Sequence, residues 1–217
     1  TRPAVPEQAP AVAVLSNPLS RRNLRGLDDV ERALAGRAGA THRVLDGFDE
    51  LPARVAGLVA AGTQVLVVNG GDGTVHAVLG ELLGNATGQQ PLLAVLPGGT
   101  SNTISADVGL RGRRDAALGR LLDAVAAGRT APLVRERAVL RVDYGGARPV
   151  FGMLFGAAGI TRGIRTHRRL MPWSWLPDAL ATVVMLALLL GSWALRGRIA
   201  REILEGERVT LTVDEGE

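Results

Sequence analysis

Gln64-Val65-Leu66-Val67-Val68-Asn69-Gly70-Gly71-Asp72-Gly73-Thr74 is the stretch that decides the fold of this chain. Its first half is a run of apolar, mostly β-branched residues, which predicts a buried strand. The residues that follow it have the spacing of one face of a helix: Val75, Val78, Leu79 and Leu82. The stretch therefore predicts a strand, a glycine turn and a helix in direct succession.

The turn at residues 70–74 combines three glycines with a single acid. Glycine lets a backbone approach a ligand closely and adopt positive φ, and a helix N-terminus favours a phosphate through its N–H groups and its dipole. A carboxylate beside a phosphate is repelled unless a cation bridges the two or the carboxylate takes a proton from an attacking hydroxyl. Asp72 therefore indicates phosphoryl transfer more than nucleotide storage.

Apolar runs and helical patterns alternate on both sides of this stretch. Strands are expected at 11–15, 42–45 and 92–96, and helices at 27–35, at 51–61 and from Asp115, as the cap, to Ala127, closed by Gly128. This alternation predicts a parallel sheet covered by helices on both faces. The predicted fold class is thus α/β, with a three-layer parallel-sheet domain.

Polar and glycine-rich loops follow three of the predicted strands, at Asn17, at 70–74 and at 98–102. Ligands of parallel sheets bind beyond the carboxyl ends of the strands, so we expect one site where these loops meet. A structural alternative stays open at two of them. Asn17 could form an Asx-turn before Pro18, and Thr100 and Asn102 could cap a helix.

Composition excludes several kinds of chemistry. The 217 residues contain no cysteine, and all 25 basic residues are Arg, so thiolate chemistry, a Walker A loop and Schiff-base catalysis are ruled out. Hydrophobic residues make up 47% and charged residues 21% of the chain, which is ordinary for a globular protein. With 3% aromatic residues, a net charge of +4 and no recognised motif, nucleic acid is not an expected partner.

The chain is expected to have two domains. Residues 1–10 are predicted to be a loose tail, 11–132 a nucleotide domain and 133–217 a β-rich domain that begins with a hairpin across Gly145-Gly146. Within the second domain, the uncharged stretch 179–195 is apolar and lies among three Trp residues. A buried helix, a helix docked on a membrane surface and a membrane span are the alternatives for this stretch.

Three motifs in order, Ser16-Asn17-Pro18, Gly70-Gly71-Asp72-Gly73-Thr74 and Leu96-Pro97-Gly98-Gly99-Thr100-Ser101-Asn102, resemble the diacylglycerol kinase catalytic domain. This lipid kinase family includes bacterial diacylglycerol and sphingosine kinases. The resemblance implies a three-layer nucleotide domain followed by part of a sandwich-like second domain that holds the lipid. It further implies ATP as co-substrate, Mg²⁺ as cofactor and transfer of the γ-phosphate to a lipid hydroxyl.

The resemblance also implies a set of site residues. Asp72 is the expected catalytic and metal-binding residue, either organising Mg²⁺ or assisting deprotonation of the lipid. The expected nucleotide contacts are Asn17, Ser20, Arg21, Gly70, Gly71, Asp72, Gly73, Thr74, Val75, His76, Gly99, Thr100 and Asn102. The chain departs from the family pattern at Arg21, His76, Ala77 and Thr103, and the late acid of the family's second domain would lie beyond Glu217.

These observations favour an ATP-dependent lipid kinase that acts as a cytoplasmic, peripherally membrane-associated protein. Two alternatives remain. A NAD kinase-like enzyme shares the Gly-Gly-Asp-Gly-Thr turn by resemblance, and a nucleotide-binding, membrane-associated protein without transfer activity fits Ala77 and Thr103. The sequence leaves open which lipid accepts the phosphate and whether the protein forms a homodimer.

Overall fold

A computed structural model describes residues 11–84, 90–143, 148–153, 187 and 191 of the chain. The chain divides into two compact units, Thr1–Leu154 and Phe155–Glu217. The predicted tail 1–10, most of the predicted second domain and, apart from Ala187 and Gly191, the apolar stretch 179–195 lie outside the described residues.

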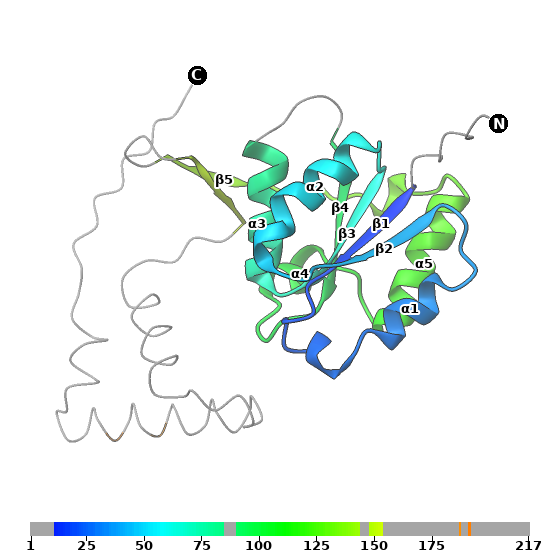
Figure 1. Cartoon of the computed structure of the whole chain (residues 1–217), viewed down its shortest axis with the longest axis horizontal. Helices are drawn as coiled ribbons and strands as arrows, with labels where there is room; N and C mark the ends of the chain where they lie inside the picture. The colour runs from blue at the N-terminus through cyan, green and yellow to red at the C-terminus, as the bar shows by residue number, and fades with distance from the viewer. Residues whose placement is uncertain (1–10, 85–89, 144–147, 154–186, 188–190, 192–217) are drawn as a thin grey trace. The chain divides into compact units, whose positions relative to one another are not determined.

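Strands and helices alternate through the first unit (Figure 1). The order is β1 (Val12–Ser16), α1 (Asp28–Leu34), β2 (Ala40–Val44), α2 (Leu51–Ala60), β3 (Val65–Gly70), α3 (Asp72–Gly84), β4 (Leu92–Pro97), α4 (Thr103–Val108) and α5 (Arg114–Ala126). Short 3₁₀ turns occur at η1 (Asn23–Arg25), η2 (Phe48–Glu50) and η3 (Ala131–Leu133). The strands and helices predicted for this region are confirmed, whereas the sequence pointed to α4 only through the alternative that Thr100 and Asn102 cap a helix.

The four strands form one parallel sheet in the order β2-β1-β3-β4. Register brings the carboxyl ends of the central strands level, because Ser16 pairs with Asn69 and Gly70 pairs with Pro97. The loops that follow β1, β3 and β4 therefore leave the sheet side by side. The predicted α/β class with a parallel sheet is confirmed.

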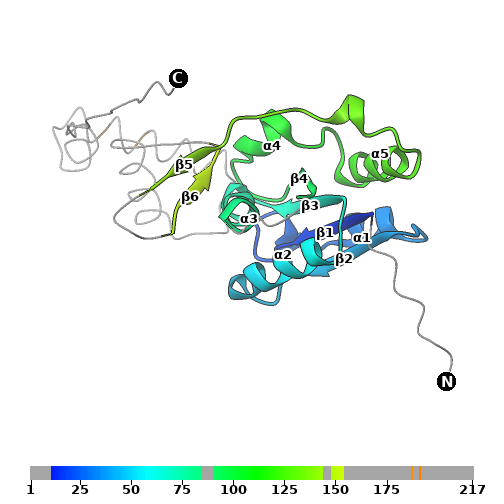
Figure 2. The same cartoon turned by 90° about the horizontal axis from the view of Figure 1, so that it is seen from above.

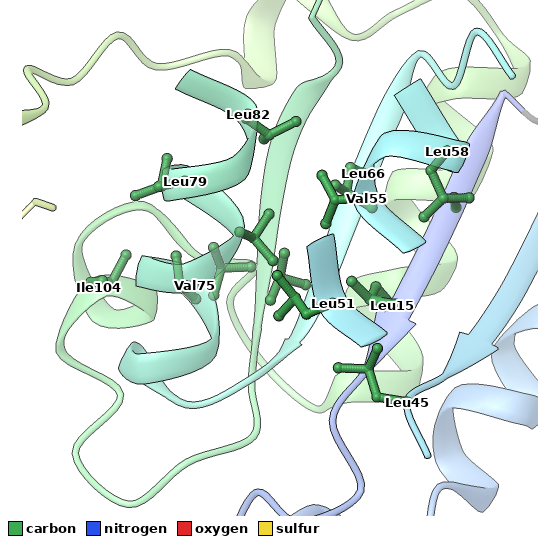
Figure 3. Packing of buried hydrophobic residues seen from close by; sticks show 14 residues of the cluster. Leu15, Leu45, Leu51, Val55, Leu58, Leu66, Val75, Leu79, Leu82 and Ile104 are labelled. Atoms are coloured by element: carbon green, nitrogen blue, oxygen red, sulfur yellow. The ribbon is translucent and has the colours of Figure 1, made fainter. Parts of the chain in front are cut away.

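Helices cover both faces of this sheet, and α2 and α5 lie on opposite sides of it (Figure 2). Alternate residues of each central strand point to opposite faces. Leu15, Leu66 and Val68 pack with α2 and α3 (Figure 3), whereas Val14 and Val67 pack with α1 and α5. β1 and β3 are buried throughout, which explains their unbroken apolar runs.

Helix α5 begins differently from the prediction but ends as predicted. Arg113, in extended conformation, is the N-cap and makes no side-chain capping bond, so the prediction that Asp115 caps this helix is wrong. Asp115 lies in the first helical turn and pairs with Arg113. At the other end, Gly128 adopts φ +65° and the amide of Arg129 reaches the carbonyl of Ala124, the αL ending that favours glycine.

The predicted hairpin is present as an antiparallel pair, β5 (Leu140–Val142) and β6 (Val150–Gly152). Residues 144–147, which include the predicted glycine turn, lie outside the described residues. β6 packs against α3, and Arg148 forms an ion pair with Glu81 of α3 at 3.7 Å. In the part of the chain that the structure describes, no helix has the length and apolar character to cross a membrane.

Candidate functional site

Three segments meet at the carboxyl edge of the sheet: residues 17–25 after β1, 70–74 from the end of β3 into the first turn of α3, and 98–103 from the end of β4 to the first residue of α4. We call them together the three-loop rim. Main-chain hydrogen bonds join them, from the Asn17 amide to the Asn69 carbonyl at 3.0 Å, from Gly98 to Gly70 at 2.9 Å and from Arg22 to Gly98 at 2.8 Å. The sequence motifs that were predicted to converge therefore lie in direct contact.

Most glycines of the rim are required by packing between the loops. A Cβ on Gly98 would lie 2.9 Å from the backbone of Gly70, and a Cβ on Gly99 would lie 2.5 Å from the Cα of Gly71. Any side chain at Gly98 or Gly99 would push the second and third loops apart. The expectation of positive φ is wrong for these glycines, because the glycines with positive φ in the described residues all lie outside these motifs.

Gly73 is different from the other rim glycines. It lies in the first turn of α3, is exposed, and a Cβ built on it would meet no atom within 4 Å. Packing therefore does not explain why this position lacks a side chain. The first amides of a helix have no partner within the helix, and the empty space where a Gly73 side chain would stand lies at the positive end of the α3 dipole.

Asp72 connects the second loop to the third. Its Oδ2 accepts the amide of Thr103 and its Oδ1 accepts the amide of Ile104, both at 3.0 Å. These are the first two amides of α4, so the Asp72 carboxylate caps a helix that begins about thirty residues away. The acid that was predicted to act on a ligand therefore also has a structural role as a helix cap.

Asn102 closes the third loop on itself. It adopts the left-handed conformation with φ 52°, its Oδ1 accepts the Gly99 amide at 2.8 Å and its Nδ2 donates to the Gly99 carbonyl at 2.7 Å. Asn102 is the N-cap residue of α4, and its carbonyl accepts the Ala106 amide at 2.9 Å, but its side chain makes no capping bond. The capping alternative is therefore confirmed for the position of Asn102 and not for its side chain. Thr100 and Ser101, at the tip of this loop, are exposed, and within the described residues their amides donate no hydrogen bond.

The first loop is fixed to the second through side chains. Asn17 forms the Asx-turn by accepting the Leu19 amide at 3.0 Å, so that alternative is confirmed. Its Nδ2 also donates to the Oγ1 of buried Thr74 at 2.9 Å. Ser20, which is buried, accepts the amide of Gly71 at 3.3 Å. These contacts make the rim a single built structure.

The remaining predicted contacts occupy different environments. His76 is exposed in the first turns of α3, and Arg21 is half-buried in the first loop. Val75 is fully buried in the core against α2 and the sheet. Its side chain therefore points away from the rim, and Val75 can offer a ligand only its main chain.

A polar network beneath the rim was not predicted from the sequence. Arg114, at the start of α5, makes two bonds to the Asp29 carboxylate at 2.6 and 2.8 Å and one to Asn23 Oδ1 at 2.6 Å. Asn23 donates to the carbonyls of Asn17 and Asn69. The ion pair between Arg114 and Asp29 thus helps to hold the loop after β1 in place. The Arg114 side chain is only 12% exposed.

The network continues across the ends of the strands. Asn69, fully buried, donates to Ser16 Oγ at 3.0 Å, and Ser16 lies 2.8 Å from Nε2 of His42 on β2. Burial lowers the pKa of His42 below its ordinary value of 6.5, and the charge of Glu31 opposes part of that change. These contacts give His42 a structural role.

The rim offers positive charge and one carboxylate. Its three loops contain three arginines, Arg21, Arg22 and Arg25, and Asp72 is their single acid. Among the described residues no group of three or more His, Asp or Glu side chains could enclose a metal ion. Mg²⁺ in kinase sites is bound by one or two carboxylates together with the substrate phosphates, so the residues present fit an ion that arrives with a nucleotide.

Comparison with known protein families identifies the domain. The diacylglycerol kinase catalytic domain model matches residues 11–132, which is more than half of the chain and contains the whole three-loop rim. This chain belongs to the diacylglycerol kinase catalytic domain family.

Solved structures with similarity to the chain include a diacylglycerol kinase and a second diacylglycerol kinase-like protein from Bacillus anthracis str. Sterne. Each is 22% identical to this chain with a TM-score of 0.45, and each match covers 52% of this chain. The matches span 40% and 42% of those chains, respectively. Comparison with curated proteins gives no match.

Proposed function

We propose that this protein is an ATP-dependent lipid kinase that transfers the γ-phosphate of ATP to the hydroxyl of a lipid such as diacylglycerol or a sphingoid base. Membership of the kinase family supports phosphoryl transfer. The observation that carries the proposal is Gly73, whose missing side chain leaves open space at the N-terminus of α3 where packing does not require it. A polyphosphate is the ligand that such a helix N-terminus favours.

In this proposal the main chain of the rim binds the phosphates. The amides of Gly73, Thr100 and Ser101 donate to phosphate oxygens, and the α3 dipole and the arginines of the first loop offset their charge. The loops are already fixed by the bonds of Asn17, Ser20 and Asn102, so little ordering is required when the nucleotide binds. In-line positioning and charge stabilisation supply most of the rate in phosphoryl transfer.

Asp72 is proposed to act on the reacting groups while it caps α4. A carboxylate has about four acceptor positions, and the two amides of α4 use two of them. The remaining positions are available to hold Mg²⁺ or to accept the proton of the lipid hydroxyl. Mg²⁺, when bound with the nucleotide, would neutralise charge on the phosphates.

A second candidate is a nucleotide-binding protein that does not transfer the phosphate. The favouring observation is that both oxygens of Asp72 already accept amide hydrogens, while Thr103 stands where the resemblance implies a further acid. Without that acid, the single carboxylate of the rim would have to bind the metal ion and also accept the proton of the lipid hydroxyl. The same loops would then bind ATP without activating an acceptor.

We also propose that residues 133–217 contribute the half that holds the lipid, and that the protein associates peripherally with the cytoplasmic side of a membrane. Two observations support this. The resemblance of this chain to the family implies a lipid substrate. In addition, residues 179–195 are a strongly apolar stretch near three Trp residues.

The test is incubation of the full chain with ATP labelled at the γ-position, Mg²⁺ and a mixed lipid extract. The proposal predicts a labelled product that partitions into chloroform. Label on added NAD and none on lipid would contradict it and favour a NAD kinase-like enzyme. Nucleotide binding by calorimetry with no labelled product from any acceptor would favour the second candidate.

A further inference from the structure

A groove separate from the three-loop rim lies between the end of α4, one side of α5 and the segment 129–135 that follows α5. We call it the α4–α5 groove. Its volume is about 750 Å³, which is within the range of sites that bind small molecules. In the described part of the chain, no residue that lines this groove belongs to the three loops of the rim.

The walls of the α4–α5 groove are held by hydrogen bonds within the domain. The Leu110 amide donates to the Val95 carbonyl of β4 at 2.9 Å, and the Leu133 amide donates to the Thr130 carbonyl at 2.8 Å. Leu121 of α5, which is buried in the core, also lines the groove. The fold itself therefore forms this groove, and no ligand is needed to shape it.

Positive charge gathers in the groove, which is lined by Arg111, Arg120, Arg129 and Arg135. None of these four side chains pairs with a carboxylate in the part of the chain that the structure describes. Arg120 and Arg135 donate to main-chain carbonyls. The guanidinium groups of Arg111 and Arg129 have no hydrogen-bond partner among the described residues.

The two acids that line the groove are already paired with other arginines. Asp107 accepts two bonds from Arg137, at 2.8 and 3.0 Å, and Asp123 pairs with Arg37. Arg37 and Arg137 do not line the groove. The charge of the four lining arginines is thus left uncompensated, and their mutual repulsion would be relieved by a bound anion.

We propose that the α4–α5 groove is a second anion site, which binds a small soluble ligand that carries two or more phosphate groups. Guanidinium groups match phosphate oxygens with pairs of parallel hydrogen bonds. Two phosphate groups bring about three negative charges or more at neutral pH, which suits four arginines. A concave site fits a small ligand better than a flat membrane surface. This site does not depend on catalysis at the rim.

The probe is inorganic pyrophosphate, titrated by calorimetry into the full chain at low salt and without Mg²⁺. Two pyrophosphates per chain are expected, one in the groove and one at the rim. Arg111→Ala/Arg129→Ala should weaken binding at one of these sites by about 100-fold, because a hydrogen bond to a charged group contributes about tenfold or more. This variant should unfold at the same urea concentration as the unaltered chain, since the two guanidinium groups have no partner among the described residues.

Two controls accompany this variant. Arg43→Ala/Arg54→Ala removes the same charge from exposed positions on β2 and α2, and should change pyrophosphate binding by less than about threefold. Gly73→Ala should weaken the rim site and leave the groove site unchanged. A single pyrophosphate that is lost only with the groove arginines would support this site and count against the proposed function. Unchanged number and affinity of bound pyrophosphates in Arg111→Ala/Arg129→Ala would overturn the groove site.

The acids of the groove give a test with the opposite sign. Asp107→Asn/Asp123→Asn should strengthen pyrophosphate binding by about threefold, because it removes negative charge from the lining. Weaker binding by this variant would overturn the proposal, since it would make the two carboxylates part of a different site.

Vesicles that contain phosphatidylglycerol distinguish a free phosphate compound from a lipid headgroup. In sedimentation, Arg111→Ala/Arg129→Ala should bind these vesicles as the unaltered chain does. Loss of vesicle binding in this variant, with pyrophosphate binding unchanged, would overturn the small-ligand site and assign the arginines to a lipid surface.

Discussion

Asp72 shows at the scale of a single residue how a motif can have two roles. The glycine turn predicts an acid that acts on a ligand, and the structure adds two bonds from its carboxylate to the first amides of α4. α4 has only six residues, so it depends on this cap more than a longer helix would. Loss of the carboxylate should therefore disturb the third loop even when no ligand is present.

Replacing Asp72 by Ala should lower the free energy of unfolding by about 1–2 kcal/mol, because two helix amides lose their acceptor. Asp72→Asn should lose less, since its amide oxygen can still accept one of the two hydrogens. Urea unfolding of the full chain measures both.

The control is Asp28→Ala, which removes an acid from the first turn of α1. It should cost only a few tenths of a kcal/mol through the helix dipole. Unchanged stability of Asp72→Ala would show that its bonds to Thr103 and Ile104 do not hold α4.

Arg114 links helix α5 to helix α1 and to the first loop of the rim. From the first turn of α5 it contacts Asp29 of α1 and Asn23 of the first loop of the rim. α1 and α5 pack together on one face of the sheet, and this ion pair extends their contact to the rim. The position of the rim thus depends on a helix that contributes no residue to the rim itself.

Arg114→Ala should lower the free energy of unfolding by about 2–3 kcal/mol, since it leaves Asp29 and Asn23 without a charged partner in a mostly buried place. Arg114→Lys should restore only part of this loss, because an ammonium cannot make the two parallel bonds to Asp29. Chemical denaturation monitored by circular dichroism gives the values.

The neighbouring residue provides the control. Arg113 is 83% exposed and pairs with Asp115 at the surface, so Arg113→Ala should change the stability by less than about 0.5 kcal/mol. Similar losses for the two variants would mean that the network beneath the rim contributes no more to the free energy of unfolding than a surface ion pair does.

Elements with a local signal could be predicted from the sequence, and elements fixed by distant partners could not. β1 and β3 follow from apolar runs, and α2 follows from its helical pattern. The bounds of α4 could not be predicted, because Thr103–Val108 is short, contains weak helix formers and is capped from a position 31 residues earlier. The partners of Arg114 lie 85 and 91 residues away.

The same distinction applies to the candidate site. The order of the loops and their meeting at one edge follow from the alternation of strands and helices. The reason for each glycine does not, because the contacts of Gly98 with Gly70 and of Gly99 with Gly71 exist only after the strands have paired. Sequence alone gives all these glycines one interpretation, whereas the structure separates Gly73 from those that packing requires.

At the scale of the whole molecule, the parallel sheet explains why the rim exists. Strand order β2-β1-β3-β4 places three loops together, and buried β1 and β3 hold their carboxyl ends level. The family domain matches residues 11–132, the region that contains these loops. We propose that this edge binds polyphosphate through its main chain, and that Gly73 lacks a side chain so that the phosphates can approach.

The most direct measurement is nucleotide affinity by calorimetry for Gly73→Ala beside Gly80→Ala, two variants of α3 at which a new Cβ meets open space. Both should preserve stability or raise it by up to about 1 kcal/mol. Gly73→Ala should weaken ADP binding by about tenfold or more, whereas Gly80→Ala should leave it unchanged. Equal ADP affinity in the two variants would contradict the claim that phosphates lie against the start of α3.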